Sequence, residues 1–305
     1  MTLTVVILTR NEAHHIVRAL GSISAIADRI FVIDSGSSDE TVSLAKAAGA
    51  TVVVHPFVHQ AQQFNWALGQ LPADTEWVMR LDADEVVTKE LAKEIEVCLP
   101  MIGPDVSGIY VSRRMTFLRR PIRWGGVFPI RVVRLFRFGT SRYENRWMDE
   151  HLIVKGPTAN FKGEILDDNL GSLGAWIAKH NSYASREVVD ILNATYGFMH
   201  QDSVARLRGG GQAGKKRWLK EHIYNRLPSG FRALFYFSYR YVVRLGFLDG
   251  YQGTAFHVLQ GFWYRFLVDA KLFEIDQYMN EKNVDVYEAI EVILDIKLDS
   301  ITRAK

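Results

Sequence analysis

The first ninety residues alternate short apolar runs with helix-like segments, and this alternation constrains the fold more than any other feature of the chain. The expected strands are 3–8, 29–33, 51–54 and 77–81, and the expected helices between them are 11–23, 41–48 and 59–71. Strands that alternate with helices over short links predict a mainly parallel sheet with helices on both faces. These strands are apolar throughout, as strands covered on both faces are. The sequence therefore predicts an α/β fold.

Three of the expected strands end in polar residues, at 9–12, 34–39 and 82–85. Ligands of such sheets bind beyond the carboxyl ends of the strands, so three polar ends on one edge predict one binding site. Neither GxGxxG nor GxxxxGKS occurs in the first ninety residues, where these strand ends lie. We therefore do not expect this site to bind phosphate through the usual dinucleotide-binding motif or through a P-loop.

Asp82 and Asp84 place two carboxylates directly after the fourth strand. Oxygen ligands suit Mg²⁺ or Mn²⁺, which usually also take phosphate oxygens. The pair therefore predicts a divalent ion that holds a nucleoside diphosphate. An acidic N-terminal cap for a helix that starts at Thr88 explains the same carboxylates, and the pair alone does not decide between the two interpretations.

Three motifs, VVILTRNEA, IDSGSSDET and LDADE, occur in this order, and together they resemble the family 2 glycosyltransferases with the GT-A fold over about residues 1–155. The resemblance implies an inverting transfer of a sugar from a nucleoside diphosphate sugar, with uridine diphosphate (UDP) as the commoner nucleotide. The implied roles are nucleoside contact for Thr9, Arg10 and Glu12, acceptance from the base for Asp34, a place near the ribose or the metal for Asp82, and metal binding for Asp84. Asp39 is expected to cap the following helix instead.

The middle of the chain adds an arginine and two acids. RLFRFG resembles a segment of bacterial lipopolysaccharide-core and exopolysaccharide transferases, which implies that Arg134 faces the diphosphate. The family usually carries an acidic catalytic base where this chain has Asp149 and Glu150. Attack on the anomeric carbon needs the acceptor hydroxyl to lose its proton. Neighbours on a strand point opposite ways, so only one acid can face the sugar; Asp149 is slightly favoured and the choice stays open.

Composition limits the other possibilities. A net charge of +3 gives no overall signal for binding a polyanion, and the single cysteine, Cys98, fits a reducing compartment. The N-terminus gains charge too early for a secretory signal, and no run of 18 apolar residues occurs, so an ordinary membrane-spanning helix is not expected. Nucleic acid is not an expected partner, because no nucleic-acid-binding motif accompanies the basic residues.

Beyond the α/β region, the sequence becomes basic and aromatic. The expected segments are a GT-A catalytic domain over 1–200, a mobile basic loop over 201–222 and an amphipathic, aromatic-rich helical region over 223–305. An expected helix over 231–245 carries apolar residues such as Phe235 on one face and Arg232, Arg240 and Arg244 on the other. Such a helix fits the surface of an anionic membrane. A helical appendix that packs on the catalytic domain or on a second subunit is the alternative.

The predicted function is a metal-dependent inverting glycosyltransferase, peripheral on the cytoplasmic face of the cell membrane. Its expected acceptor is a lipid-linked saccharide or a lipopolysaccharide core in bacterial surface polysaccharide synthesis. Two alternatives stay open: the same chemistry on a soluble acceptor such as a peptide, and a non-catalytic scaffold that binds a nucleotide sugar. The sequence leaves open whether the chain forms a homo-oligomer.

Overall fold

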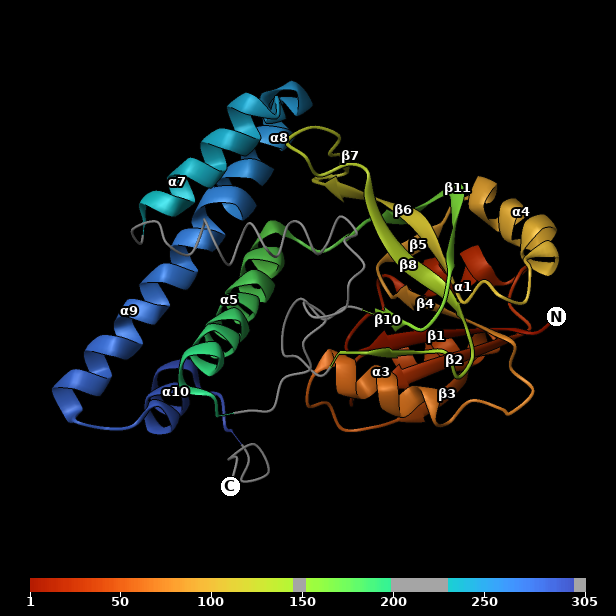
Figure 1. Ribbon diagram of the computed structural model, residues 1–305, viewed down its shortest axis with the longest axis horizontal. Coiled ribbons are helices and arrows are strands. Elements are labelled where there is room, and N and C mark those ends of the chain that lie inside the picture. The colour runs from red at the N-terminus through yellow and green to blue at the C-terminus, as the bar shows by residue number, and fades with distance from the viewer. Residues whose placement is uncertain (145–151, 199–229, 299–305) are drawn as a thin grey trace. The chain divides into compact units, whose positions relative to one another are not determined.

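The computed structural model describes residues 1–144, 152–198 and 230–298, which form two compact units (Figure 1). Residues 1–144 and 152–171 make an α/β unit, and the described residues from 172 onward make a helical unit. The domain boundaries predicted at 200 and 222 lie outside the described residues and stay predictions.

A central sheet organises the α/β unit. Its strands are β1 (Leu3–Thr9), β2 (Arg29–Asp34), β3 (Thr51–Val54), β4 (Trp77–Asp82), β5 (Glu85–Val87), β6 (Gly108–Phe117), β7 (Arg120–Pro121), β8 (Ile130–Arg137) and β11 (Thr158–Asp167). A separate antiparallel pair joins β9 (Ser141–Tyr143) to β10 (Leu152–Val154). The helices are α1 (Ile16–Ile23), α2 (Thr41–Ala47), α3 (Gln60–Leu68), α4 (Lys89–Cys98) and a 3₁₀ turn at Leu99–Met101.

The strand order in the sheet is β3-β2-β1-β4-β8-β6-β11-β5, with β7 paired to β6. β1 pairs in parallel with both β2 and β4, whereas β8 runs antiparallel to its neighbours β4 and β6. The chain moves outward from β1 to β2 and β3, then returns to place β4 on the other side of β1. Such a reversal of strand order is where open α/β sheets bind their ligands.

Helices cover both faces of the sheet, because successive residues of a buried strand point to opposite sides. In β1, Val5 and Ile7 join a core cluster with residues of α1 and α4, whereas Val6 joins a second cluster with α3. All three side chains are fully buried. The predicted α/β fold with helices on both faces is therefore confirmed.

The predicted elements of the first ninety residues are present, with two shortened helices, of which the one expected over 59–71 spans Gln60–Leu68. The helix expected from residue 11 begins at Ile16. Asn11 has a φ of 56°, which is left-handed, and its side chain accepts a hydrogen bond from the Ser38 N–H. Residues 11–15 are therefore held against the loop after β2 and do not form part of the helix.

The helical unit contains α5 (Leu173–Tyr196), α7 (Phe231–Ser238), a π-helical segment (Tyr239–Val243), a 3₁₀ turn (Gly246–Asp249), α8 (Gly250–Phe256), a second π-helical segment (His257–Trp263), α9 (Tyr264–Lys282) and α10 (Val286–Leu294). Apolar residues of α5, α9 and α10 make its core. Glu187 of α5 accepts hydrogen bonds of 2.7 Å from the Tyr264 hydroxyl and the Arg265 guanidinium of α9. No described helix is both long and apolar enough to cross a membrane.

The segments from Phe231 to Trp263 form a hairpin, which we call the aromatic hairpin. The side of its first arm that carries Arg232 and Arg240 points inward, whereas Arg244 is exposed. Arg240 is buried and bonds to Gln260, and Arg232 pairs with Asp269. The expected helix over 231–245 is also interrupted after Ser238 by the π-helical segment.

The sequence interpretation that placed Arg240 on a surface for lipid is wrong, since this side chain lies inside the hairpin. A helical pattern identifies two faces but does not say which one is turned inward. Arg244 and Phe235 are exposed, so their predicted membrane contact stays a prediction.

His257 lies at the centre of the aromatic hairpin. Its side chain is fully buried, and neither ring nitrogen has a hydrogen-bond partner among the described residues. A Cβ on Gly246 would lie 2.5 Å from this ring, so glycine lets the turn pass directly over it. Burial, together with the charge of Arg240, lowers the pKa of His257 to about 4.

We predict that His257 makes a contribution to stability that is lost as the pH falls from about 6.5 toward about 4. The unfolded chain takes up a proton at His257 near its ordinary pKa of about 6.5, whereas the folded chain does so only near pH 4. Thermal unfolding at about pH 7.5 and about pH 5 measures the loss. His257→Leu cannot take up this proton and should lose less Tm between the two pH values. An equal loss in both proteins contradicts the prediction.

Candidate active site

The polar ends of three strands lie together at one edge of the sheet. The strand pairing aligns Thr9 with Asp34 and Leu8 with Asp82, so β1, β2 and β4 end at the same level. The Thr9 hydroxyl donates a 3.0 Å hydrogen bond to Asp34 Oδ2. The three polar strand ends therefore meet at one edge, where the strand order reverses, and ligand binding at this edge stays a prediction.

Asp34 shapes the loop after β2. Its Oδ1 accepts hydrogen bonds of 2.9 Å and 2.8 Å from the backbone N–H groups of Gly36 and Ser37. Gly36 has a φ of 82°, which favours glycine at this position. Asp39 accepts a hydrogen bond from the N–H of Thr41, the first residue of α2, although Glu40 is the residue that directly precedes this helix. Asp34 itself is buried, so its predicted contact with a base stays a prediction.

The residues after β1 differ in how they are held. Arg10 is exposed at the edge. Glu12 is half-buried and contacts His15 Nδ1 at 2.6 Å, while His15 Nε2 accepts from the backbone N–H of Leu170. Because Nε2 is the acceptor, the proton lies on Nδ1 and His15 donates to Glu12. Glu12 is thereby fixed beside the segment that follows β11.

Arginine side chains surround the carboxylates that end β4. Asp82 Oδ1 lies 3.2 Å from Arg80 Nη2, and Asp82 Oδ2 lies 3.0 Å from Arg134 Nη2. Arg134 also pairs closely with Glu85, whose Oε2 accepts from the backbone N–H of Asp82. The positive groups that meet this strand end within the described residues are therefore two guanidiniums of the protein itself. The predicted contact of Arg134 with a diphosphate stays a prediction.

Burial and charge act in opposite directions on these groups. Burial alone would raise the pKa of Asp82, but the guanidiniums of Arg80 and Arg134 outweigh burial and hold this pKa below its ordinary value. Burial raises the pKa of Glu85, and the charge of Asp82 adds to the rise while Arg134 opposes it. Of the two carboxylates, Asp82 therefore loses its proton more readily than Glu85.

Asp84 projects from the turn between β4 and β5 and has different partners. Its Oδ2 accepts a 3.1 Å hydrogen bond from the Asn169 side chain, and its backbone carbonyl accepts from the Asp168 N–H. Asp84 is half-buried.

A fourth polar strand end was missed from the sequence. β11 is parallel to β6 and ends at Asp167, and Asp168 beside it pairs with Arg18. Asp167 Oδ2 lies 3.7 Å from Arg113 Nε. Burial raises the pKa of Asp167 to about 6, and the negative charge of Asp84 adds to this rise. The sequence gives only a weak signal here, since just two apolar residues, Ile165 and Leu166, precede the acids in EILDDN.

No cluster of three or more histidine, cysteine, aspartate or glutamate side chains arranged to hold a metal occurs in the described part of the chain. The donor set nevertheless fits a hard divalent ion, because carboxylate oxygens of Asp84 and Asp82 lie at the edge of the sheet and Mg²⁺ and Mn²⁺ use few protein ligands. Asp82 already serves two arginines, so Asp84 is the stronger candidate.

Two further segments bear on this edge. Asp149 and Glu150 fall outside the described residues, so the structure does not describe the predicted base. A loop from Leu118 to Pro129 enters β8, and in it Gly125 and Gly126 have φ values of 72° and 71°. Since β8 runs opposite to β4, this loop meets the sheet at the edge where β4 ends.

The chain matches known proteins over the part that contains this edge. The model of the family described as "Glycosyl transferase family 2" matches residues 4–168. A Rickettsia felis protein named as an uncharacterized glycosyltransferase is 40% identical over 196 residues, which are 61% of this chain and 69% of that one. An uncharacterized glycosyltransferase of Rickettsia typhi is 27% identical over 297 residues, 95% of this chain and 93% of that one.

A solved structure gives a partial likeness. Glucosyl-3-phosphoglycerate synthase from Mycobacterium tuberculosis, in complex with Mn²⁺, UDP and glucosyl-3-phosphoglycerate, is 24% identical, covers 37% of this chain and 44% of that one, and has a TM-score of 0.32.

We predict that Arg134→Met destabilises the α/β unit by about 3–5 kcal/mol, because it leaves Glu85 buried without its charged partner and removes one partner of Asp82. Adding Glu85→Gln should restore most of the loss, since the amide oxygen can still accept from Asp82 N–H without carrying a charge. Urea unfolding measures both variants.

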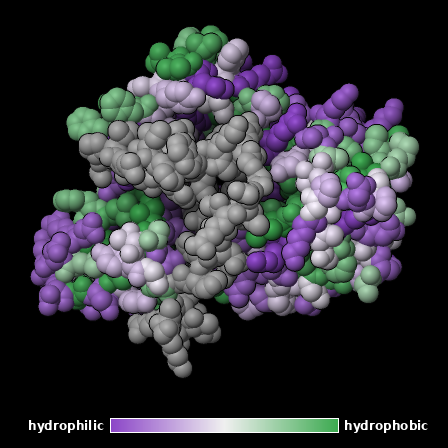
Figure 2. Space-filling model, in the orientation of Figure 1, coloured by the Kyte–Doolittle hydropathy of each residue, from purple (hydrophilic) through white to green (hydrophobic). Residues whose placement is uncertain are grey.

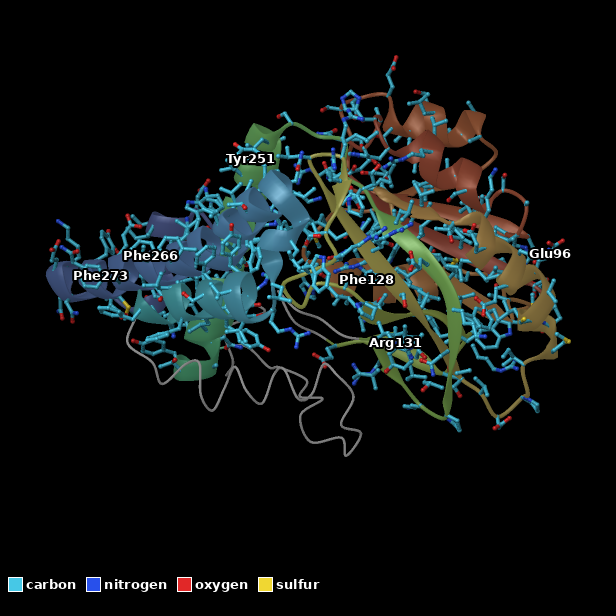
Figure 3. The ribbon with its side chains drawn as sticks, turned by 90° about the horizontal axis from the view of Figure 1, so that it is seen from above. Glu96, Phe128, Arg131, Tyr251, Phe266 and Phe273 are labelled. Atoms are coloured by element: carbon cyan, nitrogen blue, oxygen red, sulfur yellow. The ribbon has the colours of Figure 1, made fainter. Side chains whose placement is uncertain are left out.

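Arg131→Met is the matched control, since Arg131 is an exposed arginine of the same strand (labelled in Figure 3). Its cost should stay within about 0.5 kcal/mol. Equal stability of the Arg134 and Arg131 variants contradicts the assigned role of Arg134.

Proposed function

The chain belongs to glycosyl transferase family 2 and is a glycosyltransferase, and on this premise we propose that it moves one sugar from a nucleoside diphosphate sugar, with UDP as the nucleotide, and inverts the anomeric configuration. The observation that carries the proposal is the meeting of Thr9, Asp34 and Asp82 at one edge, where the strand order reverses. A nucleotide bound there would contact the loops that follow three parallel strands.

The proposed donor site divides its tasks among the strand ends. Arg10 is exposed at this edge, and its guanidinium can bind a phosphate or a nucleoside hydroxyl. Asp34 and Thr9 are buried and fixed, which supports a role in holding the shape of the nucleoside site. Glu12 is held by His15 and so has a set position from which to accept a hydrogen bond.

We assign the metal to Asp84, with Asp82 as its neighbour in the turn. A bound Mg²⁺ or Mn²⁺ would supply positive charge for the departing diphosphate. Arg80 and Arg134 keep Asp82 ionised and hold its carboxylate in place. Arg134 therefore acts as a positioning residue, because its guanidinium holds the Asp82 carboxylate in place.

The catalytic base is proposed to be Asp149 or Glu150. Inversion requires the acceptor hydroxyl to attack from the side opposite the leaving diphosphate, and a carboxylate beside it takes its proton. A carboxylate near the ring also stabilises the positive charge that develops on the sugar. Asp149 stays the favoured residue of the two.

The acceptor is proposed to be a lipid-linked saccharide or a lipopolysaccharide core, in the synthesis of bacterial surface polysaccharide. The segment RLFRFG, which resembles transferases of that kind, supports this choice. The exposed aromatic residues of the helical unit support it further, because an enzyme that acts on a lipid-borne acceptor works at a membrane surface. A soluble acceptor would require no such surface.

We predict that Asp84→Asn lowers the rate of donor hydrolysis and sugar transfer by about 10²-fold or more, because an amide is a poorer ligand for a hard cation and a metal supplies several kcal/mol of charge stabilisation. UDP binding in the presence of Mn²⁺, followed by calorimetry, should weaken in parallel. Thermal unfolding should stay close to that of the parent protein.

Glu96→Gln is the matched control, because Glu96 is an exposed carboxylate on α4 (labelled in Figure 3) and should leave all three measurements unchanged. Turnover that survives both Asp84→Asn and removal of metal by EDTA would show that Asp84 holds no catalytic metal.

We predict that Asp149→Asn and Glu150→Gln differ sharply in kcat. Loss of the true base should lower kcat by about 10²- to 10⁴-fold and leave the affinity for UDP nearly unchanged, whereas the other variant should keep most of its activity. Steady-state kinetics with a series of nucleotide sugars, combined with UDP titrations, separates the two. Parent-like kcat in both variants places the base elsewhere in the chain.

A further inference from the structure

The first arm of the aromatic hairpin exposes a row of apolar side chains, which we call the apolar ridge. Its members are Phe231, Leu234, Phe235, Tyr239, Val242 and Val243, and each is at least 49% exposed. Their spacing of three or four residues places them along one side of the arm. A helix of a water-soluble protein normally turns such a stripe toward its core. Here the stripe faces away from the core of the helical unit.

Contacts on the opposite side prevent the arm from rolling to hide the ridge. Asp269 of α9 accepts from the Gly230 N–H at 2.8 Å and from Arg232 Nε at 2.8 Å. Farther along, the Tyr241 hydroxyl lies 2.9 Å from the Thr254 hydroxyl. Turning the ridge inward would break these bonds and move buried Arg240 into the solvent. The exposure of the ridge is therefore built into the hairpin.

Apolar exposure continues at the turn of the hairpin. Leu248 is 51% exposed and Tyr251, the second residue of α8, is 79% exposed. Hydrophobic residues gather at this end in Figure 2, and Figure 3 labels Tyr251 there. Isolated apolar residues are common on protein surfaces, but a continuous row with an apolar tip marks an interaction site.

The charge around the ridge is positive. Arg244 is exposed at the end of the row, and the residues from Phe231 to Leu248 include no acid. The preceding residues 203–230 contain seven arginines and lysines and a single acid, Glu221. Apolar and aromatic side chains beside basic residues are the composition of segments that lie in the interface of an anionic bilayer.

We propose that the apolar ridge docks the chain onto an anionic lipid bilayer, with Phe and Leu side chains inserted at the level of the headgroups and Arg244 beside anionic lipid. A second copy of the chain fits this surface less well. A two-fold contact would place the positive charge of Arg244 on both sides of the interface, and like charges repel. The inference goes beyond the proposed function, since binding to lipid requires neither donor nor acceptor.

Vesicle sedimentation with the full chain tests the proposal. The probes are vesicles of phosphatidylcholine alone and vesicles that also contain phosphatidylglycerol. The parent protein should pellet with the anionic vesicles, and about 0.5 M NaCl should weaken but not abolish this binding. Phe235→Ser combined with Val242→Ser should lower the partition coefficient by about tenfold or more, because two inserted apolar groups are lost.

Val97→Ser combined with Met101→Ser is the matched control. These two residues are exposed and apolar but lie in the α/β unit, so their removal should leave vesicle binding unchanged. Parent protein that stays in the supernatant with both vesicles at low salt overturns the proposal. Ridge variants that bind like the parent also overturn it, and so does a dimer in sedimentation equilibrium that the ridge variant converts to monomer without any vesicle binding.

A site-specific probe keeps the proposal testable if the double serine variant does not fold. Cys98 is the one cysteine of the chain, so Cys98→Ser combined with Val243→Cys allows a single environment-sensitive dye to be placed on the ridge. Its emission should shift to the blue on addition of anionic vesicles. The absence of any shift contradicts insertion of the ridge. Donor hydrolysis, measured without lipid, reports separately on the proposed function.

Discussion

The pairing of Arg134 with Asp82 and Glu85 holds the end of β4 in place, and the candidate site depends on it. Two carboxylates close together at the end of a buried strand repel each other and lose their hydration. The guanidinium lies between them and is itself buried, so none of the three groups can leave without exposing an uncompensated charge. The turn that carries Asp84 outward is anchored by this internal pairing.

Sequence reasoning succeeded where a short-range pattern determines the structure. Apolar runs followed by helical segments predicted the first four strands, and the parallel arrangement that brings Thr9 and Asp34 together followed from that order. The end of β11 obeys the same rule, but its apolar residues are interrupted by charged ones, which hid the strand. The pairing of Arg134 with Glu85 joins residues 49 positions apart, and no local pattern reports such a contact.

The aromatic hairpin shows the limit of a helical pattern. The helical pattern placed Phe235 and Arg240 on different faces of the arm, as the structure does, but Arg244 is exposed, and the orientation of the arm depends on partners in α9 and in the second π-helical segment. Asp269 and Gln260 make the arginine face the inner one. These acceptors lie 20 or more residues away, so the direction of the arm is a tertiary property.

The reversed direction of β8 separates two parts of the edge that can change independently. The parallel strands β1, β2 and β4 end at this edge, whereas the segment from Leu118 to Pro129, which contains β7, leads into the start of β8 there. A residue added to that segment lengthens the part of the edge that precedes β8 and leaves the register between β4 and β8 unchanged. Descendants of one ancestral chain can thus vary what approaches the edge from this side while the strand ends that carry Thr9, Asp34 and Asp82 stay as they are.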